Sequence, residues 1–147
     1  MALNIRVYGL LVNDNDEVLL SDERRFGKEF TKFPGGGLEE GEGVKDCLIR
    51  EFQEELSLDI EVLDLFYLTD FYQESAFNSK EQLISIYYKV DSLESDRIDS
   101  SELPFDFVED AIESHRWKKI KDLTSEEVTF PIDKIVVRKL IESNLNR

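Results

Sequence analysis

Apolar and polar residues alternate along the chain in a pattern that predicts a series of short strands. An apolar, β-branched run at residues 5–12 is typical of a buried strand, and residues 60–68 and 83–90 are further strand candidates. A dense turn signal at residues 13–16, followed by the apolar triplet 18–20, predicts a hairpin that includes the first of these strands. The first part of the chain is therefore expected to be built from β-structure.

Two further segments have the spacing of helices. Residues 43–56 combine strong helix formers with helical periodicity, and Pro131 precedes a second stretch with apolar residues at the same spacing. Residues 115–120 predict a short strand. The remaining polar segments, 21–32 and 91–113, predict loops, the second with room for a short helix. This order of elements predicts a single domain over residues 1–147, of the mixed α/β (α+β) class.

The charge balance limits the partners that the surface can attract. The 33 acidic and 18 basic side chains give a formal net charge of −15, which repels nucleic acid duplexes and anionic membranes at long range. A small phosphate-bearing ligand remains compatible, because a divalent cation can bridge it to acidic side chains.

The cysteine and histidine counts exclude two kinds of site. The single cysteine excludes an intramolecular disulfide, and the single histidine excludes a multi-histidine metal site within a monomer. No signal peptide pattern and no apolar run long enough for a bilayer are evident. The expectation is a reduced, cytoplasmic protein without a membrane segment, and a monomer or a homodimer both stay open.

The most informative stretch is residues 33–58, where a glycine-rich turn leads into the predicted helix. Glu51, Glu54 and Glu55 stand at i, i+3 and i+4 and share one helical face, while Ile49, Phe52 and Leu56 form an apolar stripe elsewhere. Like charges at this spacing destabilise an isolated helix, so a bound hard cation such as Mg²⁺ would offset their repulsion. Glycines before the helix let the backbone approach a ligand closely.

This stretch resembles the Nudix box of hydrolases that act on nucleoside-diphosphate-linked compounds. The box would run over residues 36–58, and its matching positions are Gly36, Glu42, Arg50, Glu51, Glu54 and Glu55. The resemblance implies an α/β/α sandwich with a mixed β-sheet. It also implies a Mg²⁺-dependent hydrolysis of a phosphoanhydride bond, with Mn²⁺ as a substitute ion and a small nucleotide as the substrate.

The resemblance also assigns roles to residues. Glu54 and Glu55 would be the principal metal ligands, Glu51 a further ligand or the base that activates water, and Arg50 the residue that orients Glu51 or Glu54. The carbonyl of Gly36 and the carboxylate of Glu42 would complete the metal shell, with a loop-supporting role for Glu42 left open. Outside the box, the expected metal ligand is Glu113, in competition with Glu102, Glu109 and Asp110.

Basic and aromatic residues outside the box are candidates for substrate contacts. Arg24, Arg25 and Lys32 precede the glycine turn and would meet substrate phosphates, or else serve as solvated loop charges. Trp117, with His115 nearby, would contact a base or sugar, or else pack at a strand edge.

Three positions depart from the family pattern or invite a different reading. Ser57 stands where the family has glycine, which eases a left-handed exit from the helix, so the serine predicts a different and slightly costlier C-cap. Phe52 replaces an aliphatic residue and is expected to fill the same core position. Cys47 invites comparison with Nudix-like isomerases that use a cysteine, although a partly buried thiol without catalytic function is the simpler interpretation.

The sequence leaves the substrate open. Auxiliary motifs of NADH, ADP-ribose and coenzyme A enzymes are missing, which favours a mutator-type (MutT-like) pyrophosphohydrolase of nucleoside triphosphates. An ADP-ribose or nucleotide-sugar pyrophosphatase is the alternative within the enzyme class. A nucleotide-binding regulatory module without catalysis is the alternative outside it.

Overall fold

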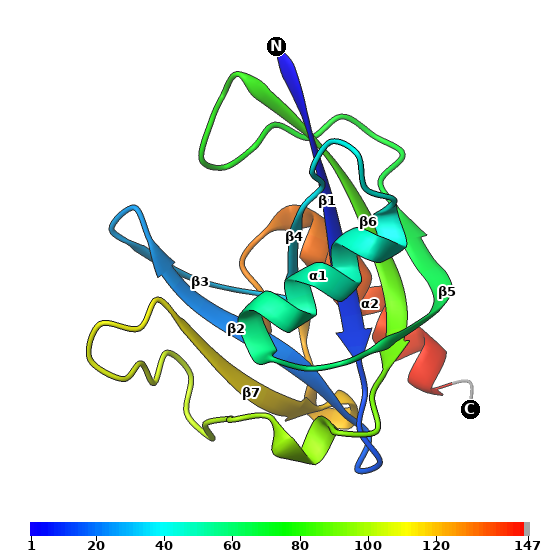
Figure 1. The fold of residues 1–147 in the computed structure, drawn as a ribbon, viewed down its shortest axis with the longest axis vertical. Helices are drawn as coiled ribbons and strands as arrows, with labels where there is room; N and C mark the ends of the chain where they lie inside the picture. The colour runs from blue at the N-terminus through cyan, green and yellow to red at the C-terminus, as the bar shows by residue number, and fades with distance from the viewer. Residues whose placement is uncertain (146–147) are drawn as a thin grey trace. The chain divides into compact units, whose positions relative to one another are not determined.

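The computed structural model describes residues 1–145 and contains two compact units. One unit consists of residues 1–11 and 34–97, and the other of residues 12–33 and the chain from residue 98 onward. Each unit has one β-sheet and one α-helix (Figure 1). The mixed α+β class predicted from the sequence is confirmed.

The first unit is built on a four-stranded sheet with the order β4-β1-β6-β5. Its strands are β1 (Ala2–Leu11), β4 (Gly35–Gly37), β5 (Glu61–Leu68) and β6 (Glu81–Asp91). β1 runs parallel to β6 and antiparallel to β4, and β5 runs antiparallel to β6. The predicted mixed sheet is therefore present, with β1 and β6 at its centre.

Helix α1 (Val44–Leu56) packs against β4, β1 and β5 of this sheet (Figure 1). Its buried residues are Cys47, Leu48 and Phe52. Ile49 is 40% exposed, so the predicted apolar stripe is wrong at this position, and the neighbouring Leu48 is buried instead. Phe52 is fully buried, as expected, and fits because it lies over Gly9. A Cβ atom at Gly9 would come within 2.7 Å of the Phe52 ring.

The helix ends at Ser57 in the left-handed conformation, with φ 50° and ψ 40°. The Ser57 amide donates to the carbonyl of Gln53 at 3.0 Å, and the Leu58 amide donates to the carbonyl of Phe52 at 3.4 Å. The carbonyls of the last turn are thus satisfied by an exit that favours glycine. The different C-cap predicted from the serine is wrong, because Ser57 keeps the left-handed exit, and the extra cost of that exit stays a prediction.

Replacing Ser57 by glycine is expected to stabilise the protein. Glycine removes the strain of an L-residue at positive φ but adds entropy to the unfolded chain, which leaves a net gain of about 0.5–1 kcal/mol. The free energy of unfolding from urea titrations measures the gain, with Ser57→Ala as the control. The alanine variant keeps the strained geometry, so an equal gain from alanine would contradict this explanation.

The second unit holds a three-stranded antiparallel sheet with the order β3-β2-β7. Its strands are β2 (Glu17–Arg25), β3 (Lys28–Lys32) and β7 (Glu113–Lys119). Phe26 and Gly27, both at positive φ, form the two-residue turn between β2 and β3, a conformation typical of tight hairpins. The loop predicted for residues 21–32 is therefore wrong, because these polar residues form most of a hairpin.

The hairpin predicted for residues 5–12 and 18–20 is also wrong. β1 pairs with β4 and β6, whereas β2 pairs with β3 and β7. Across the turn at residues 13–16, the only strand pairing is an isolated antiparallel bridge between Val12 and Val18. The turn signal was correct, but each strand has its partners in a different sheet.

Among the remaining elements, the short helix in the segment 91–113 and the helix from Pro131 were predicted, whereas the two 3₁₀ helices after β7 were not. A short 3₁₀ helix, η1 (Ser95–Arg97), lies in the segment 91–113, and two more, η2 (Ile120–Asp122) and η3 (Ser125–Glu127), follow β7. Helix α2 (Pro131–Leu145) begins at the predicted proline and buries Ile132, Val136 and Leu140 at helical spacing. Within residues 1–145, none of the helices has the length and apolar character required to cross a membrane.

Candidate active site

Strand β4 carries the glycines of the box next to the acidic face of α1. Gly36 pairs with Val7 of β1, and its missing side chain leaves space for a carboxylate. A Cβ atom at Gly36 would lie 2.5 Å from the carboxyl carbon of Glu51 and 2.5 Å from its Oε1 atom. The glycine therefore allows the strand backbone and the Glu51 carboxylate to approach each other closely.

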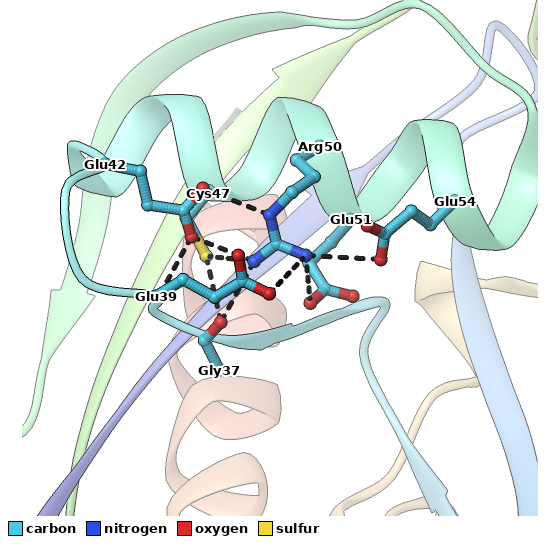
Figure 2. A network of polar contacts seen from close by, with 7 residues as sticks. All are labelled: Gly37, Glu39, Glu42, Cys47, Arg50, Glu51 and Glu54. Atoms are coloured by element: carbon cyan, nitrogen blue, oxygen red, sulfur yellow. Dashed lines mark hydrogen bonds and ion pairs between the residues drawn. The ribbon is translucent and has the colours of Figure 1, made fainter.

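Arg50 is the centre of the polar network on this face (Figure 2). Its Nε and Nη2 atoms donate to the two carboxylate oxygens of Glu42 at 3.0 Å and 2.8 Å. Its Nη1 atom donates to Glu51 Oε1 at 3.1 Å and to Glu54 Oε2 at 3.2 Å. Nη2 also donates to the carbonyl of Gly37 at 3.1 Å. One guanidinium thus connects the loop before the helix, strand β4 and two carboxylates of the helix.

Hydrogen bonds between Glu42 and Arg50 shift the pKa values of both groups. The two hydrogen bonds from Arg50, together with one from the Glu39 amide, lower the pKa of the Glu42 carboxyl to about 2. The hydrogen bond to Glu42 likewise raises the pKa of Arg50 above its ordinary value. Glu42 therefore carries its charge at neutral pH and holds the guanidinium in place with a bidentate contact.

Glu39 is a member of the network that the sequence reasoning missed. Its Oε1 atom lies 3.7 Å from Arg50 Nη1, and its side chain is 68% exposed. No signal in the sequence distinguishes it from Glu40 beside it, because its proximity to Arg50 depends on the path of the loop.

The residues on this face fit a hard divalent cation. The Glu51 side chain is 13% exposed and lies against the Gly36 backbone, whereas the Glu54 side chain is 59% exposed and reaches solvent. Glu55 follows on the same helical face and is half-buried. Carboxylate oxygens beside a close backbone are the donors that Mg²⁺ prefers, with water and substrate phosphates completing its shell.

Cys47 lies in α1 and is shielded from solvent. Its Sγ atom is 3.5 Å from the carbonyl of Gly37, and burial, followed by the nearby Glu42, raises the pKa of the thiol to about 12. A thiol with this pKa is protonated at neutral pH and is a poor nucleophile. This environment supports the structural interpretation of Cys47 over the catalytic one.

We expect Cys47 to resist thiol reagents in the native protein. At pH 8, Ellman's reagent is expected to leave the folded thiol unmodified during a period in which the urea-unfolded chain reacts completely. Absorbance of the released thionitrobenzoate measures the reaction, and the chain's single cysteine makes the signal unambiguous. Equal rates with and without urea would show that the thiol is accessible and reactive.

The second unit positions the basic residues expected to contact phosphates. Arg24 donates from Nε to the carbonyl of Ala111 at 2.7 Å, donates from Nη2 to the carbonyl of Glu109, and lies 4.5 Å from the centre of the Phe107 ring. Arg25 forms ion pairs with Glu23 at 2.9 Å and Glu113 at 2.8 Å. Both arginines therefore have partners within their own unit.

Glu23 is a buried carboxylate that the sequence did not single out. Although burial alone would raise its pKa, the charge of Lys32 and hydrogen bonds from Arg25, Lys32 and Ser21 hold that pKa below its usual range. Lys32, 5% exposed, lies 3.0 Å from Glu23 and also donates to the carbonyl of Phe33 at 3.2 Å. This buried ion pair gives Lys32 a structural partner.

Strand β7 carries the candidates from the later part of the chain. Glu113 and His115 lie on it two positions apart, and half-buried Trp117 pairs in register with Leu19. Burial lowers the pKa of His115 to about 4, so its imidazole is neutral at pH 7. Three competing acids occupy the segment before the strand and are exposed: Glu102, Glu109 and Asp110.

Comparison with known proteins agrees with the geometry of the box. The sequence model of the NUDIX domain family matches residues 2–140. The chain belongs to the Nudix family. As a Nudix hydrolase it is an enzyme of the class that cleaves acid anhydrides in phosphorus-containing compounds. No curated protein matches the chain significantly in sequence.

Several solved structures share the fold. The solution structure of the E. coli ORF135 protein has a TM-score of 0.73 at 16% identity, over 100% of this chain and 94% of that one. The MutT protein of methicillin-resistant Staphylococcus aureus 252 has a TM-score of 0.61 at 26% identity, over 97% and 99%. A UDP-X diphosphatase has a TM-score of 0.62 at 18% identity, over 98% of this chain and 65% of that one.

Proposed function

We propose that this Nudix hydrolase is a Mg²⁺-dependent pyrophosphohydrolase that cleaves a phosphoanhydride bond in a nucleoside triphosphate. The observation that carries the proposal is the single guanidinium of Arg50, which holds Glu42, Glu51 and Glu54 beside the glycine strand. Such an arrangement suits a reaction in which anionic phosphate oxygens must be neutralised and a water molecule positioned.

The proposed roles follow from the contacts of each side chain. Glu51, Glu54 and Glu55 would hold the cation, with the Gly36 carbonyl nearby. Mg²⁺ when bound would neutralise phosphate oxygens and lower the pKa of a bound water. Glu51, the least exposed of the Arg50-bound helix carboxylates, would accept the proton from the attacking water at a carboxylate oxygen.

Arg50 and Glu42 would act by positioning. Arg50 limits the rotamers of Glu51 and Glu54, because both accept from the same Nη1 atom. Both Glu42 oxygens already accept from Arg50, and Oε1 also accepts from the Glu39 amide at 2.9 Å. The proposal therefore gives Glu42 the loop-supporting role rather than that of a metal ligand.

Substrate contacts are proposed on the second unit. Arg25, whose side chain is 36% exposed, is the basic candidate best suited to exchange a carboxylate partner for a phosphate. Arg24 and Lys32 would contribute only their positive charge to phosphate binding, since their donors already have partners. Glu113 would supply the metal ligand outside the box, and Trp117 would contact the base.

A substrate panel tests the proposed function. Untagged protein with Mg²⁺ would be incubated with normal and oxidised nucleoside triphosphates, ADP-ribose, nucleotide sugars and dinucleoside polyphosphates, and the products quantified by ion-exchange chromatography. We expect a nucleoside triphosphate to yield a monophosphate and pyrophosphate. Preferred cleavage of a nucleotide sugar would favour the alternative suggested by the UDP-X diphosphatase fold. Silence with both Mg²⁺ and Mn²⁺ would overturn the proposal.

A further inference from the structure

Glu113 and His115 present two metal-binding side chains on one face of β7. Residues two apart on a strand point to the same side of the sheet. A carboxylate oxygen of Glu113 and a ring nitrogen of His115 lie within 4.8 Å of each other. This separation is close enough for both atoms to reach one ion after small side-chain rotations.

The imidazole of His115 has a buried nitrogen whose hydrogen bonding is incomplete. The residue is 7% exposed, and its Nε2 atom has no hydrogen-bond partner among residues 1–145. Burying such an atom without a partner is unfavourable, because its hydrogen bond to water is lost and not replaced. A ligand that accepts the nitrogen lone pair would supply that partner.

The backbone around His115 is held firmly. His115 lies in register with Ser21 of β2, and its carbonyl accepts from the Ser101 amide at 2.8 Å. The backbone of His115 is therefore held by β2 and by Ser101. Such support favours an imidazole that is already in place before a metal ion binds.

The charged side chains near the pair are of both signs. Lys32 and Arg25 each form an ion pair with the buried carboxylate of Glu23, and Arg25 also contacts Glu113 Oε1 at 2.8 Å. The Arg25 side chain is 36% exposed and has space to turn toward solvent. A divalent ion at Glu113 would then replace one positive charge with another of higher valence.

We propose that Glu113 and His115 form a site for a zinc-class ion such as Zn²⁺ or Co²⁺, with His115 Nε2 as its nitrogen ligand. Imidazole nitrogen together with carboxylate oxygen is a donor set that such ions prefer, whereas Mg²⁺ prefers oxygen alone. The inference shares Glu113 with the proposed function and goes beyond it, because the proposed Mg²⁺ shell takes no ligand from His115.

Nuclear magnetic resonance of the imidazole nitrogens tests the site directly. The chain has one histidine, so untagged ¹⁵N-labelled protein gives a single pair of ring nitrogen signals. We expect Zn²⁺ to shift the Nε2 signal to that of a metal-bound nitrogen, and Mg²⁺ at saturation to leave it in place. An Nε2 signal unmoved by saturating Zn²⁺ would overturn the proposal.

Affinity measurements on two variants provide an independent check. His115→Gln and Glu113→Gln are each expected to weaken Zn²⁺ binding by roughly tenfold or more, and His115→Gln is expected to leave Mg²⁺ binding unchanged. Competition with a zinc-sensitive dye measures Zn²⁺ affinity, and circular dichroism verifies folding. Unchanged Zn²⁺ affinity in a folded His115→Gln variant would refute the site. Hydrolysis of the panel is scored on the wild-type protein with Mg²⁺ or Mn²⁺ and no Zn²⁺, so failure of the zinc site and failure of the proposed function give different results.

Discussion

Replacing Glu54 by glutamine is expected to lower kcat by about 10³-fold or more while leaving the protein folded. The amide keeps the size of the side chain but removes the charge that would hold a cation and its bound phosphate. The Glu54 side chain is 59% exposed, and its single hydrogen bond from Arg50 at 3.2 Å can still be accepted by an amide oxygen. Stability should therefore change by less than about 0.5 kcal/mol.

The measurement separates loss of chemistry from loss of fold. Initial rates at saturating Mg²⁺ and substrate give kcat, and thermal unfolding gives the stability of the same preparation. Glu142→Gln is the matched control, because Glu142 is an exposed glutamate of α2 in the other unit. If the Glu54→Gln variant turned over at the wild-type rate, Glu54 would have no catalytic role and the proposed use of the box would be wrong.

The two helices could be predicted from the sequence, because the spacing of apolar residues within each segment is that of a helix. Helix α1 was expected at residues 43–56 and found at Val44–Leu56, and the start of α2 at Pro131 was found as expected. The Arg50 contact to Glu54 was accessible for the same reason, because one turn of helix brings side chains four positions apart together. Local periodicity determines both results.

The β2–β3 hairpin was missed because its inward face is charged. Glu23 and Lys32 are 2% and 5% exposed and neutralise each other, so a segment rich in ionisable residues was interpreted as a solvated loop. Phe26 adopts a positive φ in the turn, although phenylalanine rarely does so and is therefore not recognised as a turn residue in a sequence. A pattern based on hydrophobicity cannot recognise a buried strand whose burial depends on paired charges.

The candidate residues of the second unit could be named from the sequence, but the contacts between them could not be predicted. The sequence placed Arg25 before the glycine turn and Glu113 before Trp117, yet nothing in it indicated the ion pair that joins them across 88 residues. The pairing of Ser21 with His115 likewise depends on the register of β2 against β7. Register is set by the complete sheet, and single segments contain little information about it.

Replacing Gly36 by alanine is expected to lower kcat by about 10²-fold with a much smaller effect on stability. The new Cβ atom would lie 2.5 Å from the Glu51 carboxyl carbon, so the carboxylate must move away from β4. A displacement of about 1 Å in a reacting group can cost this much in rate. The clash is with the end of a flexible side chain, which can rotate, and the backbone at Gly36 does not have a positive φ.

The neighbouring glycine distinguishes a requirement of the site from a requirement of the fold. At Gly35, with φ 144°, a Cβ atom would lie 2.1 Å from the carbonyl oxygen of Val7, so Gly35→Ala should instead lower the melting temperature strongly. Gly43→Ala is the mild control, because its Cβ would approach only Asp46 Oδ2, at 3.3 Å. Rates and melting temperatures of the three variants test the assignment. A Gly36→Ala enzyme with wild-type kcat would mean that Glu51 does not need its place against β4, and that the Gly36 of the box serves the strand rather than the chemistry.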